Sequence, residues 1–155
     1  MITRKNMVFC ATILIASAPV SYASEHALRL ADVPAAVQKT AQEQSKGAAI
    51  KRYVKDNEDG KLEYEVEMTV DGHSKDLTIA PDGKLLEVEE QVNLDALPAA
   101  VRDGIQKKAG KATVTKVESI TKNDKLVAYE AQVRTAGKHS EIQVGPDGQA
   151  LQHEE

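Results

Sequence analysis

Aromatic residues and cysteine are both scarce in this sequence. Of its 155 residues, none is tryptophan, one is phenylalanine, four are tyrosine and one, Cys10, is cysteine. A single cysteine cannot form a disulfide within the chain. Few aromatic side chains leave little to stack on nucleic-acid bases or to anchor a tight protein interface. The core must therefore consist of valine, leucine, isoleucine and alanine around a few tyrosines.

An excess of positive charge is also missing. The chain has 20 lysine and arginine residues against 24 acidic ones, a net charge of −4. Nucleic acids and anionic membrane surfaces both attract a basic protein surface, so neither is indicated as a partner. The sequence also has no glycine-rich phosphate loop, which leaves nucleotide binding without support.

The first 23 residues have the order of a signal peptide. Arg4 and Lys5 precede an apolar run at 7–18, and the Ser-Tyr-Ala triplet at 21–23 places small residues where signal peptidase cleaves. The run is shorter than the roughly 20 apolar residues that span a bilayer. Cys10 lies inside this run and does not follow it. The sequence predicts a periplasmic or secreted product without a stable membrane anchor.

Cleavage is predicted between Ala23 and Ser24. Removing 23 of the 155 residues leaves 132, and the loss of two basic residues moves the net charge from −4 to −6. The exported product then has no thiol, because Cys10 leaves with the signal. An intact mass that begins at Ser24 is the expected result, whereas a retained or acylated Cys10 would contradict the prediction.

The rest of the chain contains one structural unit of about 60 residues that is used twice. VPAAVQK at 33–39 matches LPAAVRD at 97–103, and Pro-Asp-Gly at 81–83 recurs at 146–148. The sequence therefore predicts three segments, with the two repeats forming one compact domain. They are a signal peptide at 1–23, a first repeat at 24–91 and a second repeat at 92–155.

Each repeat is expected to begin with a helix. Pro34 suits a first helical turn, where its missing N–H costs nothing. Val33, Val37 and Ala41 recur every fourth residue, as Leu97, Val101, Ile105 and Ala109 do in the second repeat. These apolar stripes are narrow, so each helix needs a sheet to cover.

Four strands are expected after each helix. Alternation at 63–70 places Tyr64, Val66 and Met68 on one face and glutamates on the other. The Asp-Gly steps predict hairpin turns with glycine at positive φ, and Leu151 should begin the last strand. Short hairpins imply antiparallel pairing with the helices on one face. The predicted fold class is thus α+β, with the order α-β-β-β-β twice.

This pattern resembles the PepSY-like domain family. The matching features are the Leu97-Pro98 helix start, the Tyr-Glu pairs at 64–65 and 129–130, Gly72, Gly137 and the two Pro-Asp-Gly turns. The family is similar to the β-lactamase inhibitor protein, in which tandem α-β4 units form a curved sheet that grips a partner protein. The resemblance implies an exported, non-enzymatic binding domain. The family name also suggests, by analogy, a role in restraining peptidases.

One face of the first repeat is a candidate partner-binding surface. If Val66 and Met68 face the helix, the opposite face carries Glu63, Glu65, Glu67, Asp76 and Glu87. Neighbouring carboxylates repel one another, and a basic partner would relieve that repulsion. A solvated charged surface is the alternative. In the second repeat the same face is mixed, with Glu130, Gln132, Arg134, Glu141 and Gln143.

No catalytic, cofactor-binding or metal-ligating residue is predicted. Without a mature cysteine, a nucleophile would need serine or threonine beside a histidine, but His26, His73, His139 and His153 lie in no nucleophile motif. The acidic loop at 56–60 lacks the ligand spacing of a calcium-binding EF-hand. We therefore expect a protein that is not an enzyme and has no cofactor.

The sequence is compatible with two functions. The first is a protein-binding module that restrains or inhibits an envelope or secreted protein, such as a peptidase. The second is a periplasmic protein that binds a small ligand or a cation on the acidic face.

Overall fold

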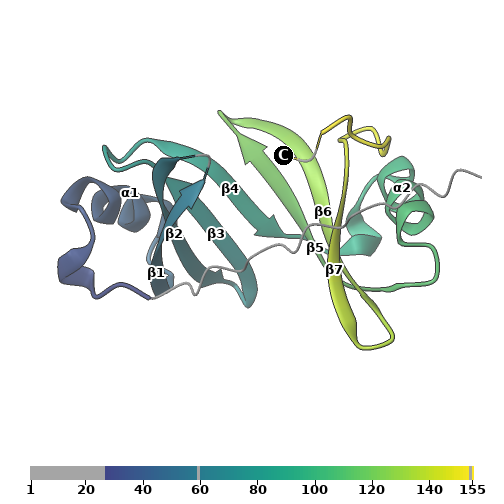
Figure 1. Cartoon of the computed structure of the whole chain (residues 1–155), viewed down its shortest axis with the longest axis horizontal. Helices are drawn as coiled ribbons and strands as arrows, with labels where there is room; N and C mark the ends of the chain where they lie inside the picture. Colours follow the sequence, from purple (N-terminus) through teal and green to yellow (C-terminus); the bar gives the residue numbers. More distant parts are fainter. Residues whose placement is uncertain (1–26, 59, 154) are drawn as a thin grey trace, which may run out of the picture.

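The computed structural model describes residues 27–58, 60–153 and 155, so the predicted signal peptide and His26 lie outside the described residues. Within these residues, seven strands form one antiparallel sheet in sequence order (Figure 1). The helices are α1 (Ala35–Ser45) and α2 (Ala99–Ala109), and the strands are β1 (Ala49–Glu58), β2 (Lys61–Val70), β3 (His73–Ile79), β4 (Leu85–Gln91), β5 (Thr113–Lys122), β6 (Lys125–Thr135) and β7 (Lys138–Val144). No helix in this described part has the length and apolar character needed to cross a bilayer.

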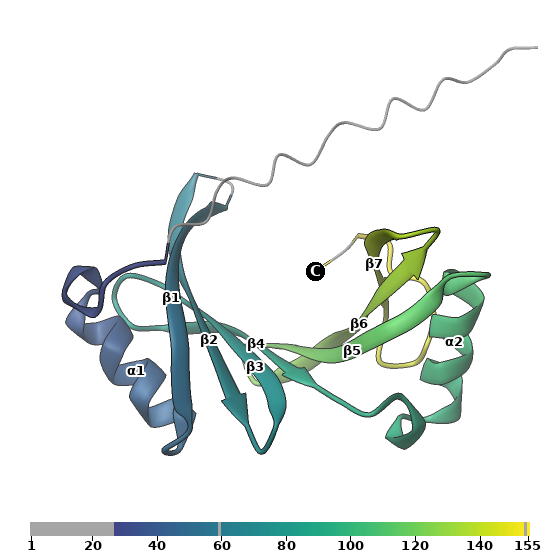
Figure 2. The same cartoon turned by 90° about the horizontal axis from the view of Figure 1, so that it is seen from below.

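The sheet is curved, and both helices lie on its convex side. Helix α1 packs on β1, β2 and β3, whereas α2 packs on β6 and β7 at the other end (Figure 2). The two repeats are joined by the β4–β5 pairing, so the sheet is continuous across them. The opposite side, which we call the concave face, has no helix over it in the described residues. The predicted α+β class with helices on one face of an antiparallel sheet is confirmed.

The apolar stripes predicted on the two helices face the sheet, as expected. Pro34 and Pro98 immediately precede the two helices. Val37 and Val101, at equivalent positions of the two repeats, are both fully buried. Each stripe fills the space between its helix and the sheet. This packing stabilises the helices, since neither has enough apolar surface to be stable alone.

Two apolar clusters form the core, one under each helix. The first contains Val66 and Met68 of β2, which confirms the face predicted to meet α1. Tyr53 and Tyr64 belong to this cluster and Tyr129 belongs to the second, each at most 9% exposed. All aromatic side chains of the described residues are therefore used in the core, on the helix side of the sheet.

The two Pro-Asp-Gly turns have the same hydrogen bonds. Gly83 N donates to Ala80 O at 2.8 Å, and Gly148 N donates to Gly145 O at 2.8 Å. The two glycines have φ of +88° and +78°, a region that other residues adopt only under strain. The predicted turn conformation is confirmed in both repeats.

The prediction of an eighth strand is wrong. After the second turn, the described residues show only an isolated bridge between Ala150 and Val144. The core-facing Val88 of β4 corresponds to His153 in the second repeat, so the apolar alternation that holds β4 is lost. Strand β4 also pairs with β3 and β5 on its two sides, a support that the described residues after Ala150 lack in this sheet. The second repeat therefore has three strands, and the two repeats are not identical.

Candidate binding face on the concave side of the sheet

Strand register aligns acidic side chains in rows across the concave face. Residues directly opposite each other in an antiparallel pair project from the same face. Glu67 of β2 lies opposite Asp76 of β3, which in turn lies opposite Glu89 of β4. One row along, Glu65 is followed across the sheet by Thr78 and then by Glu87.

The structure places the five predicted residues on this face. Glu65, Glu67, Asp76 and Glu87 lie on the adjacent strands β2, β3 and β4, in the two rows just described. Glu63 lies opposite Asp56 of β1, one row nearer to the β1–β2 hairpin. The strand alternation therefore predicts the shared face correctly, while Glu63 stands apart from the centre.

Three carboxylates converge near the middle of the concave face. One oxygen from each of Asp76, Glu89 and Glu118 lies within 4.8 Å of the other two. They come from β3, β4 and β5, so this carboxyl cluster spans the junction between the repeats. Glu118 is 2% exposed. Beyond it, Glu130 of β6 lies directly opposite Glu118 and continues the acidic row.

Burial and repulsion from neighbouring carboxylates raise the pKa values of Asp76 and Glu89. Burial raises the pKa of Asp76 to about 6, with Glu118 and Glu67 adding to the shift. Glu89 lies opposite Ile120, a buried side chain. Burial, followed by the charge of Glu130, raises its pKa to about 8. The folded protein therefore favours the protonated form of Glu89.

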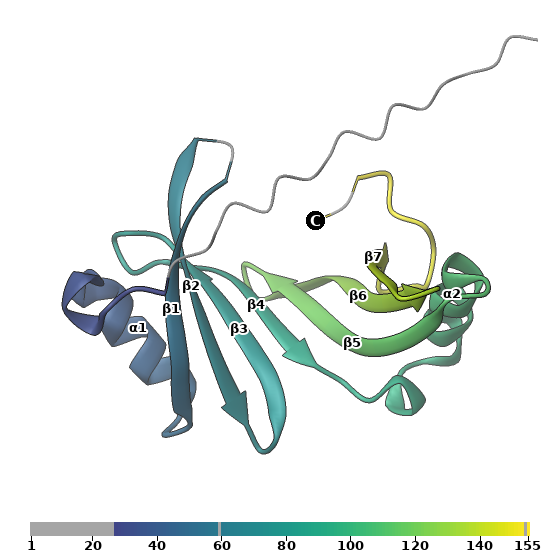
Figure 3. The ribbon, with the colours of Figure 1, turned by 60° about the horizontal axis from the view of Figure 1, so that its bottom comes forward.

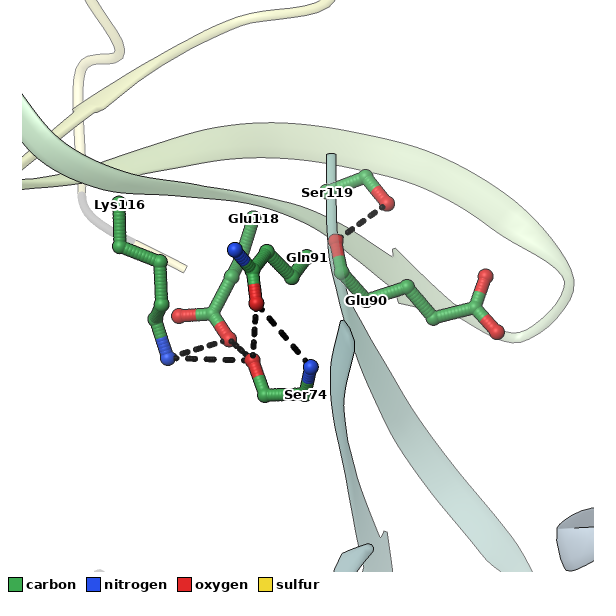
Figure 4. Close-up of polar contacts among 6 residues, drawn as sticks. All are labelled: Ser74, Glu90, Gln91, Lys116, Glu118 and Ser119. Carbon is green, nitrogen blue, oxygen red and sulfur yellow. Dashed lines mark hydrogen bonds and ion pairs between the residues drawn. The ribbon is translucent and has the colours of Figure 1, made fainter. Parts of the chain in front are cut away.

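Figure 4 shows the polar network that ties the cluster to the strands. Lys116 Nζ lies 2.7 Å from Glu118 Oε1. Ser74 Oγ donates to the same carboxylate at 3.0 Å, and Ser74 N donates to Gln91 Oε1 at 3.1 Å. The contacts link β3, β4 and β5. They satisfy a buried carboxylate that would otherwise destabilise the junction.

Ser74 and Lys116 have the residue types of a serine–lysine dyad but not its arrangement. Lys116 Nζ lies 3.4 Å from Ser74 Oγ and closer, at 2.7 Å, to Glu118. The Ser74 hydroxyl itself donates to Glu118 and not to the lysine. A nucleophilic serine needs a neighbouring base that takes its proton. Here the lysine donates, so the network stabilises the fold and does not activate the hydroxyl.

Two other basic side chains on the concave face contact acids. Arg52 Nε donates to Glu67 Oε1 at 2.6 Å. Lys122 Nζ lies 3.5 Å from Glu87 Oε2. The acidic side chains still outnumber these bases. Asp76 lies opposite Glu89 and Glu118 lies opposite Glu130, and the Glu89 and Glu118 carboxylates approach each other diagonally across β4 and β5. The concave face is therefore negative at its centre once these groups are ionised.

Sequence reasoning misses Glu89 and Glu118. Glu89 follows Glu87 by two positions in β4, so the alternation already applied to β2 would have identified it. Glu118 depends on the register of β5 and on the β4–β5 pairing, which joins one repeat to the next. No local pattern contains that pairing.

The remaining candidate residues are peripheral. His73, His139 and His153 are exposed. Of the acidic loop at 56–60, residues 56–58 belong to strand β1, where Glu58 pairs with Lys61 of β2.

The fold is similar to that of solved structures from Bacteroides. No protein-family model matches the chain, and no curated protein matches it significantly. A protein from Bacteroides eggerthii, provisionally described as periplasmic, has a TM-score of 0.64 and 20% identity over 77% of this chain and 86% of that chain. A DUF2874 family protein from Bacteroides ovatus has a TM-score of 0.61 and 18% identity over 77% and 85% of the two chains.

A BLIP-like protein from Bacteroides fragilis has a TM-score of 0.57 and 20% identity over 77% of this chain and 83% of that chain. At these identities the comparisons show the fold alone. The similarity to this BLIP-like protein is consistent with a BLIP-like fold. The more specific resemblance to the PepSY-like family stays a prediction.

Proposed function

We propose that this chain is an exported, non-enzymatic protein-binding module that docks a basic surface of its partner on the concave face. The observation that carries the proposal is the acidic row from Glu67 to Glu130 on a curved face that no helix of the described residues covers. Partly buried carboxylates side by side are unfavourable in the free protein. An ammonium or guanidinium group from a partner offsets that repulsion.

Two comparisons support this proposal. The BLIP-like protein from Bacteroides fragilis shares the fold. The resemblance to the PepSY-like family implies the same kind of curved sheet, one that grips a partner protein. The Bacteroides eggerthii protein is provisionally described as periplasmic, which agrees with the signal peptide predicted at 1–23. We propose that the protein acts in the periplasm, and that its target is an envelope or secreted protein, such as a peptidase, that the module restrains.

The chemistry of the face indicates a charge-steered interface. Tyr53, Tyr64 and Tyr129 are buried on the other side of the sheet, so they cannot serve as aromatic anchors. Opposite charges mainly accelerate encounter and set specificity, and their effect falls as salt rises. We expect the complex to associate rapidly and to weaken strongly with ionic strength.

Neutralising Glu65 and Glu67 tests the docking face. A partner is first isolated from periplasmic extract with the exported protein, and its affinity is then measured for Glu65→Gln/Glu67→Gln. Removing two charges should weaken binding by about 0.5–2 kcal/mol. Most of the loss should come from slower association, with a shallower salt dependence.

A matched control removes the same charge from the helix side. Glu43 and Asp103 are exposed on α1 and α2, away from the concave face. The double variant Glu43→Gln/Asp103→Asn should bind the partner like the parent. If the concave-face variant and the parent bound an identified partner with equal affinity, the concave face would be a solvated surface and not the docking site.

Cation binding is the second candidate function, and the carboxyl cluster is the feature that favours it. Oxygens of Asp76, Glu89 and Glu118 lie close enough to converge on one ion. Lys116 already supplies a positive charge to Glu118 at 2.7 Å, so a metal would have to displace this ammonium. Thermal unfolding with and without millimolar Ca²⁺ separates the two functions, since a cation site predicts a clear rise in melting temperature.

A further inference from the structure

Strand β7 forms an outer edge of the sheet. It pairs with β6 on one side, and Figure 3 shows it at the end of the sheet, beside α2. Beyond the Ala150 bridge, Glu155 contacts the side chains of Gln143 and Lys122. No backbone hydrogen bond from the described residues after Ala150 reaches residues 138–142 of β7. This stretch of the edge is therefore open to a further strand.

The opposite edge of the sheet, at β1, is covered where Ala27 and Leu28 lie against it. Ala27 forms a bridge with Val54, and Leu28 N donates to Tyr53 O at 2.7 Å. Leu28 also packs against the first core cluster. A covered edge resists an added strand, so β7 offers the better site for one.

Alternate residues of β7 direct their backbone groups outward. Gly145 N donates at 2.8 Å to a carbonyl of the segment after the turn, on the side away from β6. Residues two positions apart in a strand direct their backbone groups the same way, so those of Gln143, Glu141 and His139 also face outward. Lys108 Nζ of α2 donates to Gln143 O at 3.0 Å. The outward groups of Glu141 and His139 lie beyond that contact, where a further strand would pair.

A cleft of about 560 Å³ lies between α2 and the end of β7. Gly104 of α2, Val144 of β7 and Ala150 are among its walls. Gly104 and Ala150 stand where the first repeat has Thr40 and Leu85, and Leu85 packs against the first core cluster. Smaller side chains in the second repeat therefore leave room beside the edge for apolar side chains from outside.

Strand β4 of the first repeat shows how a neighbour of β7 would fit. Val88 of β4 lies opposite Leu77, which is fully buried. Ile142 is the counterpart of Leu77, but it is only partly buried against the second core cluster. An apolar side chain opposite Ile142 would cover it as Val88 covers Leu77. On the other face of the strand, a basic side chain opposite Glu141 would form a favourable cross-strand pair.

We propose that the outer edge of β7 binds an extended segment of a protein partner, which adds to the sheet antiparallel to β7. Its basic side chains lie on the concave face and its apolar side chains point towards α2. Backbone hydrogen bonds hold such a segment, and its alternate side chains give specificity. The cleft accepts the apolar side chains, and Glu141, in a chain of net charge −4, attracts the basic ones. The inference goes beyond docking on the carboxylates, because it assigns a second binding site that depends on backbone groups.

The hexapeptide acetyl-Lys-Val-Lys-Val-Lys-Val-amide is the probe of this edge. It is titrated into the ¹⁵N-labelled exported protein, and amide hydrogen exchange is followed by NMR. Exchange at His139 and Glu141 should slow at least about tenfold in the complex, because their N–H groups then donate to the peptide. Unchanged exchange at both residues with saturating peptide overturns the proposal. Exchange that is already slow in the protein alone also overturns it, because the edge is then covered.

Two N-methylated peptides separate strand addition from attraction between charges. They have the same composition and charge, and the methyl group is on the central lysine in one and on the central valine in the other. When a lysine pairs with Glu141, the lysine N–H points to β7 and the valine N–H points away. The lysine-methylated peptide should therefore bind about tenfold more weakly. Equal affinities would show attraction to carboxylates alone, which overturns strand addition and leaves the acidic docking face standing.

A second copy of this chain is the other candidate occupant of the edge, since exposed edges also pair with each other. Sedimentation equilibrium of the exported protein without peptide should give the mass of a monomer. A dimer that the valine-methylated peptide dissociates would place a second β7 on this edge, and would overturn a partner segment as its occupant.

Discussion

Replacing Gly148 with alanine is expected to destabilise the protein by about 3 kcal/mol or more, as measured by urea unfolding. Two causes add at this position. Gly148 has φ of +78°, which is strained for alanine. The added Cβ would lie 2.0 Å from Ala100 O, a backbone atom of α2 that can move only if the helix moves. The second Pro-Asp-Gly turn therefore sets how closely α2 approaches the sheet.

Gly104→Ala tests the other side of the same contact. A Cβ on Gly104 would lie 2.1 Å from Gly148 O, so a loss of about 2–3 kcal/mol is expected, although alanine is the better helix former by about 1 kcal/mol. Gly137→Ala is the control, because Gly137 has φ of +81° but no atom within 4 Å of its Cβ. It should cost only about 1 kcal/mol. If all three variants unfolded alike, the close approach would not matter to stability.

The first repeat docks its turn on its helix by a different contact. Thr40 corresponds to Gly104, and its Oγ1 donates to Gly83 O at 2.7 Å. A Cβ on Gly83 would lie 2.9 Å from Ala36 O, a wider approach than in the second repeat. A hydrogen bond thus joins turn and helix in one repeat, whereas close backbone contact joins them in the other. The sequence duplication predicts the turn but not this difference.

Local patterns predict most of the secondary structure correctly. Apolar spacing identifies α1 and α2, alternation identifies the buried face of β2, and the Asp-Gly steps identify both turns. Each of these features depends on residues a few positions apart. Their physical causes, helical and strand periodicity and the backbone freedom of glycine, are visible in a short window of sequence.

Long-range pairing is what the sequence leaves open. The carboxyl cluster exists because β4 pairs with β5, which brings Glu89 and Glu118 together across the two repeats. Duplication indicates two units but not whether their sheets join. The missing eighth strand has a similar origin, since the copy of β4 lacks both Val88 and a second neighbouring strand. Whether a segment forms a strand depends on the partners available to it.

The carboxyl cluster makes stability depend on pH. Glu89 has a pKa of about 8 in the folded protein, against 4.5 for an unperturbed glutamate, because burial and the charges of Glu130 and Glu87 disfavour its ionised form. The folded state therefore binds this proton more tightly than the unfolded chain does. Stability from this group is complete below pH 4.5 and is lost as pH rises towards and through 8. Asp76 acts in the same direction at lower pH.

Glu89→Gln is expected to stabilise the protein at pH 8 by about 2 kcal/mol and to change stability little at pH 5. The amide is similar in shape to the protonated carboxyl and cannot ionise, so the variant does not charge the buried cluster as pH rises. The gain is smaller than the whole pKa shift implies, because interacting carboxyls titrate as a group. Glu43→Gln, an exposed change on α1, is the control and should follow the parent at both values. Urea unfolding at pH 5 and pH 8 measures the difference. If the Glu89→Gln variant were no more stable than the parent at pH 8, ionised Glu89 would not destabilise this sheet.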